Sequence, residues 1–221
     1  MHRFPIKSRI CAPKQVRTGV RVNMKKKGLG ECMMDMKWDA VKNAVRERLL
    51  SSEWRDLEQI VKVGVAADIW RTWYIDLSDT LQDAIIPVTY PLLQALGVSL
   101  HDLEAAAKNY NEGYTLQSMG EILGFGRTTD IPMCVISNRD CRYGAAGVLN
   151  SKVQQQLGEI FPAGTYILPS SIHEVIAVPS ENADPKDLAC IVRDINRSQV
   201  PENERLSDHV FQLKDGQLCA A

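Results

Sequence analysis

The sequence predicts an α+β fold: a mostly antiparallel sheet with helices packed on one face, preceded by a helical N-terminal region. Hydrophobic residues make up 45% and charged residues 24% of the 221-residue chain, ordinary values for a protein with a packed core. From residue 131 onward, apolar stretches of strand length and amphipathic helices follow in the order β-β-α-β-β-α-β. Strands joined by short turns pair antiparallel, so this order disfavours a doubly wound parallel sheet.

Residues 35–130 are expected to be mainly helical with short strands, and to form one domain with residues 131–221. Asp35 is a suitable N-cap for a first helix. The apolar residues that follow it lie at helical spacing, namely Trp38, Val41, Val45 and Leu49.

Two strands are favoured within the otherwise ambiguous stretch 54–83. Residues 60–65 are rich in β-branched side chains, and residues 69–77 are rich in aromatic ones. We expect the aromatic cluster to lie in the core, rather than to form a platform for nucleic-acid bases. Ser78 is a plausible N-cap for a helix after these strands.

Capping and turn residues mark the next elements. A short strand is expected at 84–88, followed by a helix at 90–96 that a glycine ends. Residues 99–102 have the spacing of a capping box at the start of another helix. A further short helix is expected around residues 116–123.

The C-terminal part, 131–221, shows the clearest pattern. Helices are expected to start at Asn150 or Ser151 and at Asp184-Pro185, where N-cap chemistry is strong, and Leu188, Ile191, Val192 and Ile195 should form the buried stripe of the second. Gly144 and Gly147 suggest that another backbone comes close to the second strand. The expected strands cover 131–137, 143–149, 165–168, 173–178 and 206–213.

The charge distribution separates residues 1–34 from the rest of the chain. They carry nine Lys or Arg against one acid, Glu31, a net charge of +8, whereas the remainder has 17 bases and 26 acids, a net charge of −9. Codons for Gly30-Glu31 can supply a ribosome-binding sequence shortly before Met33 or Met34. We therefore expect this basic extension to be disordered or not translated, and nucleic-acid binding to be supported only if it is translated.

Neither membrane insertion nor secretion is indicated. No stretch approaches the roughly 18 consecutive apolar residues of a membrane helix, and no apolar segment follows the basic N-terminus as in a secretory signal. The six cysteines form no C-x-x-C pair, and no histidine stands at zinc-finger spacing from them. These features predict a cytoplasmic protein without a metal or cofactor.

Several blocks of the C-terminal half resemble a bacterial family known only as domain of unknown function 5688. The blocks are residues 131–138, 144–146, 166–175, 184–185, 196–197 and 206–210, of which 166–175 is the most specific. The resemblance extends from about Ala84 to about Val210, and family members usually carry more sequence before Ala84. It implies a fold relationship without an established activity, and leaves an accessory or anti-defence role on a mobile element open.

The best polar constellation surrounds the run Tyr166–Val178. Strand alternation would place Ser171 and His173 on one face, and with Asp208 they supply the residue types of nucleophile, base and orienting acid. No G-x-S-x-G elbow surrounds the serine. We favour the alternative that Pro169–Ser171 is a bend whose hydroxyls satisfy local backbone groups.

Other polar residues are weaker candidates. Turns of the C-terminal half can bring Asn138, Arg139, Arg142 and His209 to one edge as binding residues, with Arg127 as a further arginine for an anion. His173, Glu174, Asp208 and His209 lack the spacing of a metal site, and the loop 124–129 lacks the ending of a phosphate-binding loop.

Three functions remain open from the sequence. The favoured one is a non-catalytic binding or accessory module that recognises another macromolecule, because no complete catalytic set is present. The second is a hydrolase that uses Ser171, His173 and Asp208, or a metal held by the same region. The third is a nucleic-acid-associated protein that uses residues 1–34, or an anti-defence protein from a mobile element.

Overall fold

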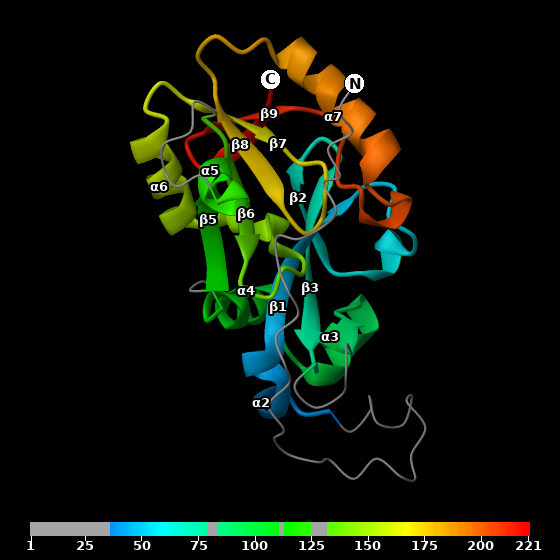
Figure 1. Cartoon of the computed structure of the whole chain (residues 1–221). Helices are drawn as coiled ribbons and strands as arrows, with labels where there is room; N and C mark the ends of the chain where they lie inside the picture. Colours follow the sequence, from blue (N-terminus) through cyan, green and yellow to red (C-terminus); the bar gives the residue numbers. More distant parts are fainter. Residues whose placement is uncertain (1–35, 79–83, 111–112, 125–131) are drawn as a thin grey trace.

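The computed structural model describes residues 36–78, 84–110, 113–124 and 132–221, and its strands form two antiparallel sheets (Figure 1). The α+β class and the antiparallel pairing are thus confirmed. The basic extension 1–34, the helix expected after Ser78 and Arg127 lie outside the described residues.

The first sheet has the order β1-β3-β2, with β4 paired to β3. Its strands are β1 (Val45–Ser51), β2 (Lys62–Ala66), β3 (Ile69–Asp76) and β4 (Ile85–Pro87). The strands predicted at 60–65 and 69–77 are therefore confirmed, and Trp73 and Tyr74 are buried as expected.

The predicted first helix is wrong beyond its first turn. α2 covers only Trp38–Val41, the 3₁₀ turn η1 (Lys42–Ala44) follows, and the chain is extended from Val45. Leu49 and the adjacent Leu50 are both fully buried, which one face of a helix cannot achieve but a strand between two packing layers can. Pairing with β3 over seven residues decides the conformation.

The two helices that follow the first sheet in the chain begin and end at the residues predicted to cap them. α3 (Tyr90–Leu96) ends at Gly97, whose φ of 65° is left-handed. α4 (Leu100–Lys108) starts with the complete capping box of Ser99 and Asp102. Both helices pack with α2 on the first sheet, around the fully buried Trp73 and Leu103.

The second sheet has the order β10-β9-β7-β8-β6-β5. Its strands are β5 (Tyr114–Ser118), β6 (Cys134–Asn138), β7 (Thr165–Leu168), β8 (Val175–Pro179), β9 (Phe211–Lys214) and β10 (Gln217–Ala220). The short helix expected around residues 116–123 is confirmed only as α5 (Met119–Leu123), because residues 116–118 belong to β5, which pairs with β6.

The strand predicted at 143–149 is a 3₁₀ helix instead, η4 (Gly144–Leu149). The close backbone approach inferred from its glycines is real, because a Cβ at Gly144 would lie 2.5 Å from the Asn138 nitrogen. The segment therefore packs across β6 as a tight turn of small residues.

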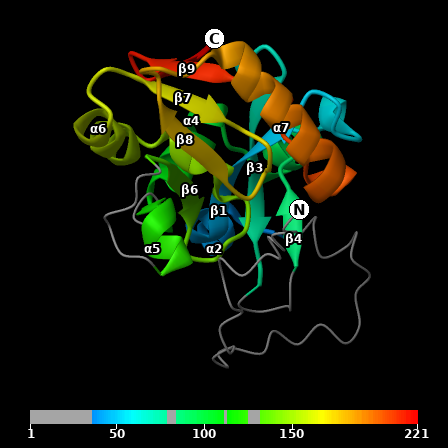
Figure 2. The same cartoon turned by 45° about the horizontal axis from the view of Figure 1, so that its top comes forward.

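The two long C-terminal helices contact opposite faces of the second sheet, which corrects the expected one-face arrangement (Figure 2). α6 (Ser151–Ile160), capped by Asn150, packs through Val153 and Leu157 against the face that carries Ile167 and Val175. α7 (Pro185–Gln199), capped by Asp184, packs against the face that carries Leu168 and Val178. Of its predicted stripe only Val192 is buried, whereas Ile191 and Ile195 are 49% and 37% exposed.

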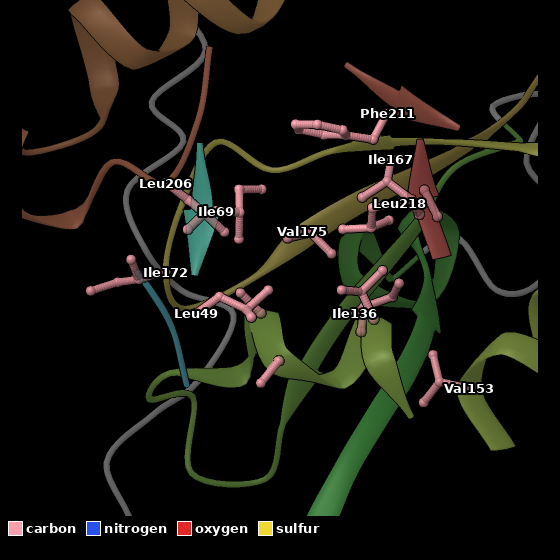
Figure 3. Packing of buried hydrophobic residues seen from close by; sticks show 14 of the residues in the cluster. Leu49, Ile69, Ile136, Val153, Ile167, Ile172, Val175, Leu206, Phe211 and Leu218 are labelled. Atoms are coloured by element: carbon pink, nitrogen blue, oxygen red, sulfur yellow. The ribbon is translucent and has the colours of Figure 1, made fainter. Parts of the chain in front are cut away.

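The main core joins the two sheets (Figure 3). Leu49 and Ile69 from the first sheet meet Ile136, Ile167 and Val175 from the second. Leu206 and Phe211, near the C-terminal strands, complete this cluster. Within the described residues, no helix is long and apolar enough to cross a membrane.

Candidate functional site

Ser171 and His173 lie in a bend between β7 and β8, and their hydrogen bonds go to backbone N–H groups. The Ser171 hydroxyl accepts a hydrogen bond from the His173 backbone N–H at 3.1 Å. The His173 ring accepts one from the Tyr143 backbone N–H at Nδ1, 3.1 Å away, and stacks on the Tyr143 ring. Its Nε2 lies 3.8 Å from Glu204 Oε1. Burial lowers the pKa of His173, so the neutral ring is favoured.

The structure does not bring Asp208 to this pair. Its carboxylate accepts a hydrogen bond from the Asn196 side chain on α7 at 2.6 Å. The backbone runs antiparallel here, with Ile172 N–H bonded to the Glu204 carbonyl and Ser207 N–H to the Pro169 carbonyl. His173 and Asp208 therefore lie toward opposite ends of the pairing, and within the described part of the chain no hydrogen bond or ion pair joins them into a triad.

A different serine, histidine and aspartate do meet, at the turn between β2 and β3. Ser207 Oγ donates to Asp68 Oδ2 at 2.7 Å, and His209 Nδ1 lies 3.0 Å from the same oxygen. Ser207 is buried and directs its proton to the carboxylate, so it is not arranged as a nucleophile activated by His209. The cluster ties the C-terminal segment to the first sheet.

The predicted binding residues Asn138, Arg139, Arg142 and His209 do not form one site. The Asn138 amide closes its own turn, because Nδ2 donates to the Arg142 carbonyl and Oδ1 accepts from the Arg142 N–H. Arg139 is exposed, and the Arg142 guanidinium lies 5.6 Å from the Tyr143 ring centre. Among the described residues, no group of three His, Cys, Asp or Glu side chains is placed to hold a metal ion.

None of the predicted site residues lines either of the two clefts described next, which lie in the described part of the chain. One, of about 620 Å³, lies between the end of α6 and the β8–α7 connection and is lined largely by apolar and proline residues. The other, of about 580 Å³, lies on the first sheet. It is lined by Ser52, Trp54, Asp56, Leu57, Glu58, Gln59, Lys62 and Trp70.

The second cleft combines two indole rings with charged and amide side chains, so it offers a ligand both apolar ring surfaces and polar partners. Trp70 comes from β3 and Lys62 from β2, and Trp54 comes from the connection between β1 and β2. Lys62 Nζ donates to the Leu57 carbonyl at 3.2 Å and lies 5.4 Å from the Trp70 ring centre. Asp56 has a left-handed φ of 59°, immediately before the 3₁₀ turn η2 (Leu57–Gln59).

A row of stacked groups supports Trp54 from the protein interior. The Arg48 guanidinium lies 5.6 Å from the Trp54 ring centre and 5.0 Å from that of Tyr143, which in turn stacks on His173. Arg48 is 2% exposed, and its Nε finds no hydrogen-bond partner among the described residues. Burial lowers the pKa of this guanidinium, and the aromatic faces offset part of its desolvation. The predicted His173 region thus contributes to the support of the cleft.

The cleft could not be predicted from the sequence, because most of its lining residues lie in the stretch 54–83, whose secondary structure the sequence pattern leaves ambiguous. The aromatic pattern predicts that both Trp70 and Trp73 lie in the core, but only Trp73 is fully buried. A local signal did exist in the segment Trp54–Gln59, where one tryptophan is surrounded by charged and amide side chains that cannot all be buried.

Comparisons with known proteins give one relationship. No curated protein and no solved structure matches the chain. A family model described as a family of unknown function (DUF5688) matches residues 17–214. The match covers most of the chain, and therefore extends well beyond the C-terminal half in which the resemblance was found. The chain belongs to the DUF5688 family.

Proposed function

We propose that this protein is a non-catalytic binding module that holds a segment of a macromolecular partner in the cleft of Trp54 and Trp70. The observation that supports the proposal is the presence of two partly buried indole rings in one cleft of about 580 Å³. Tryptophan side chains in concave, partly desolvated positions dominate the binding energy of many interfaces. Arg48, which lies against Trp54 from the protein interior, gives that ring a fixed position before binding.

The polar residues considered for catalysis support the same proposal. The hydrogen bonds of the three candidate residues go to structural groups. Ser171 and His173 accept from backbone N–H groups, and Asp208 accepts from the side chain of Asn196. Chemistry at a serine would need a base within hydrogen-bond reach of its hydroxyl, and the Ser171 hydroxyl is bonded to a backbone amide.

Comparative affinity capture tests the proposal. The wild-type protein, a Trp54→Ala/Trp70→Ala variant and a Tyr90→Ala control are immobilised and incubated with extract of the native host. Tyr90 is 49% exposed and does not line the cleft, so the control removes a comparable aromatic side chain elsewhere. Thermal unfolding of each variant verifies that it folds.

A partner that depends on the cleft should bind the wild type and the control alike. Loss of one hot-spot tryptophan costs about 2 kcal/mol or more, or about thirtyfold in affinity. The proposal fails if every reproducible partner is retained by the folded double variant, or if no partner is captured.

A further inference from the structure

The cleft also carries information about the chemistry of its occupant. Resting on the function proposed above, we infer that the cleft takes an arginine side chain from a basic peptide segment of the partner. The inference combines the two indole rings with the charges at the rim of the cleft.

Two carboxylates border the rings. Asp56 and Glu58 are exposed and line the cleft, and among the described residues neither carboxylate has an ion pair or hydrogen bond. They repel phosphate and carboxylate ligands and attract cations, so the rim selects by charge. Affinity from exposed ion pairs alone is small, and the indole rings must supply the rest.

An arginine satisfies both features at once. Its planar guanidinium stacks on an indole face and still donates to carboxylates at its edge, whereas an ammonium group is a compact, strongly hydrated charge. The protein already uses this contact internally, since Arg48 and Lys62 lie against Trp54 and Trp70.

The ammonium group of Lys62 already occupies part of the cleft, so removing its charge should change the affinity for a cation. This group lies 5.4 Å from the Trp70 ring centre inside the cleft, where it competes with an incoming cation for that ring. Lys62→Met keeps most of the apolar stem and removes the charge. This variant should therefore bind a basic peptide more tightly, whereas a role of Lys62 as a ligand contact would make it bind more weakly.

The test measures fluorescence anisotropy of a labelled octapeptide of alternating arginine and glycine, with the full chain as the binding protein. Peptides in which lysine, glutamine or glutamate replaces arginine are the comparison probes. The variants are Asp56→Asn/Glu58→Gln, Lys62→Met, Trp54→Ala and the matched control Glu53→Gln. Asparagine tolerates the left-handed backbone of position 56, and Glu53 is an exposed carboxylate of the same loop outside the cleft.

The arginine peptide should bind best, and more weakly as salt increases. The Asp56→Asn/Glu58→Gln variant should lose about tenfold in affinity, and Lys62→Met should gain about two- to fivefold. Trp54→Ala should lose about thirtyfold or more, and Glu53→Gln should stay within about twofold of the wild type.

Other outcomes overturn the inference and distinguish it from the proposed function. Equal, tryptophan-dependent binding of the glutamine peptide would leave a binding cleft but refute the selection for arginine. An equal loss in Glu53→Gln would show that the general charge of the loop acts, not the cleft. If no probe binds while affinity capture finds a cleft-dependent partner, the ligand class is wrong and the binding function stands.

Discussion

Replacement of Arg71 by methionine is expected to destabilise the fold by about 3 kcal/mol, because it leaves the Glu47 carboxylate buried without a cation. Glu47 Oε2 accepts from Arg71 Nε at 2.8 Å and lies 2.7 Å from Nη2, and Oε1 accepts from the Tyr114 hydroxyl at 3.0 Å. The Glu47 side chain is only 8% exposed, but Arg71 is 21% exposed, so some water can replace the guanidinium. We therefore expect a loss of stability at the low end of the range of about 3–5 kcal/mol that is typical of breaking a buried ion pair.

Urea unfolding at 25 °C measures this cost. In thermal unfolding of a chain of this size, the same loss of about 3 kcal/mol corresponds to a fall of roughly 6–12 °C in Tm. Glu104→Gln is the matched control, because Glu104 contacts the same guanidinium at 3.2 Å but is 31% exposed, and its loss should cost less than about 1 kcal/mol.

A second substitution tests the reason for the loss. Glu47→Gln in the Arg71→Met background removes the unpaired charge and keeps an acceptor for Tyr114, so it should recover about half of the lost stability. If Arg71→Met costs no more than Glu104→Gln, or if the double variant is no more stable than Arg71→Met, the assumed burial of the Glu47 charge is incorrect.

Two further predictions concern packing and pH. Gly144→Ala should lower the free energy of unfolding by more than about 2 kcal/mol, since its Cβ would lie 2.5 Å and 2.7 Å from backbone atoms of Asn138 and Ser137. Gly97→Ala is the control, because Gly97 has a positive φ but open space around it, and this change should cost about 1 kcal/mol. Equal losses for the two variants in urea unfolding would contradict the prediction. Burial raises the pKa of Tyr74, Tyr110 and Tyr114, so the contribution of these tyrosines to stability should be constant up to about pH 10 and fall above it, where the unfolded chain loses phenolic protons first. Tyr114→Phe should make this alkaline fall shallower, and an unchanged dependence of the urea midpoint on pH would count against the assignment.

Elements with strong local chemistry could be predicted from the sequence. The starts of α4, α6 and α7 follow from Ser99 with Asp102, from Asn150, and from Asp184 with Pro185, because a cap acts within four residues of the helix end. The same holds for the bend at Ser171, whose hydroxyl bonds the backbone two residues later.

Elements decided by distant pairing could not be predicted in this way. Val41, Val45 and Leu49 have helical spacing, yet only Val41 lies in a helix, because β3 pairs with residues 45–51 and holds Val45 and Leu49 in a strand. The apolar face of α7 was expected to be buried along its length, but the sheet beneath it reaches Val192 and leaves Ile191 exposed.

The same limit applies to the site. The candidate cleft needs Trp54 from a connection and Trp70 from a strand, and nothing in the local sequence states that they share one surface. Asp68 and His209 meet across 141 positions of the chain, which spacing rules cannot detect. Ser171 and Asp208 were grouped by residue type alone, and their hydrogen bonds separate them.

The position of β9 has a consequence for the growing polypeptide. β7 pairs with β8 on one side and with β9 on the other, and Phe211 of β9 completes the core shared by both sheets. Until residues 211–214 leave the ribosome, β7 has an open edge with unpaired backbone groups beside exposed apolar side chains, a template for association with other chains. Because β9 is synthesised after β7, its pairing with β7 protects the nascent chain from aggregation as well as extending the sheet.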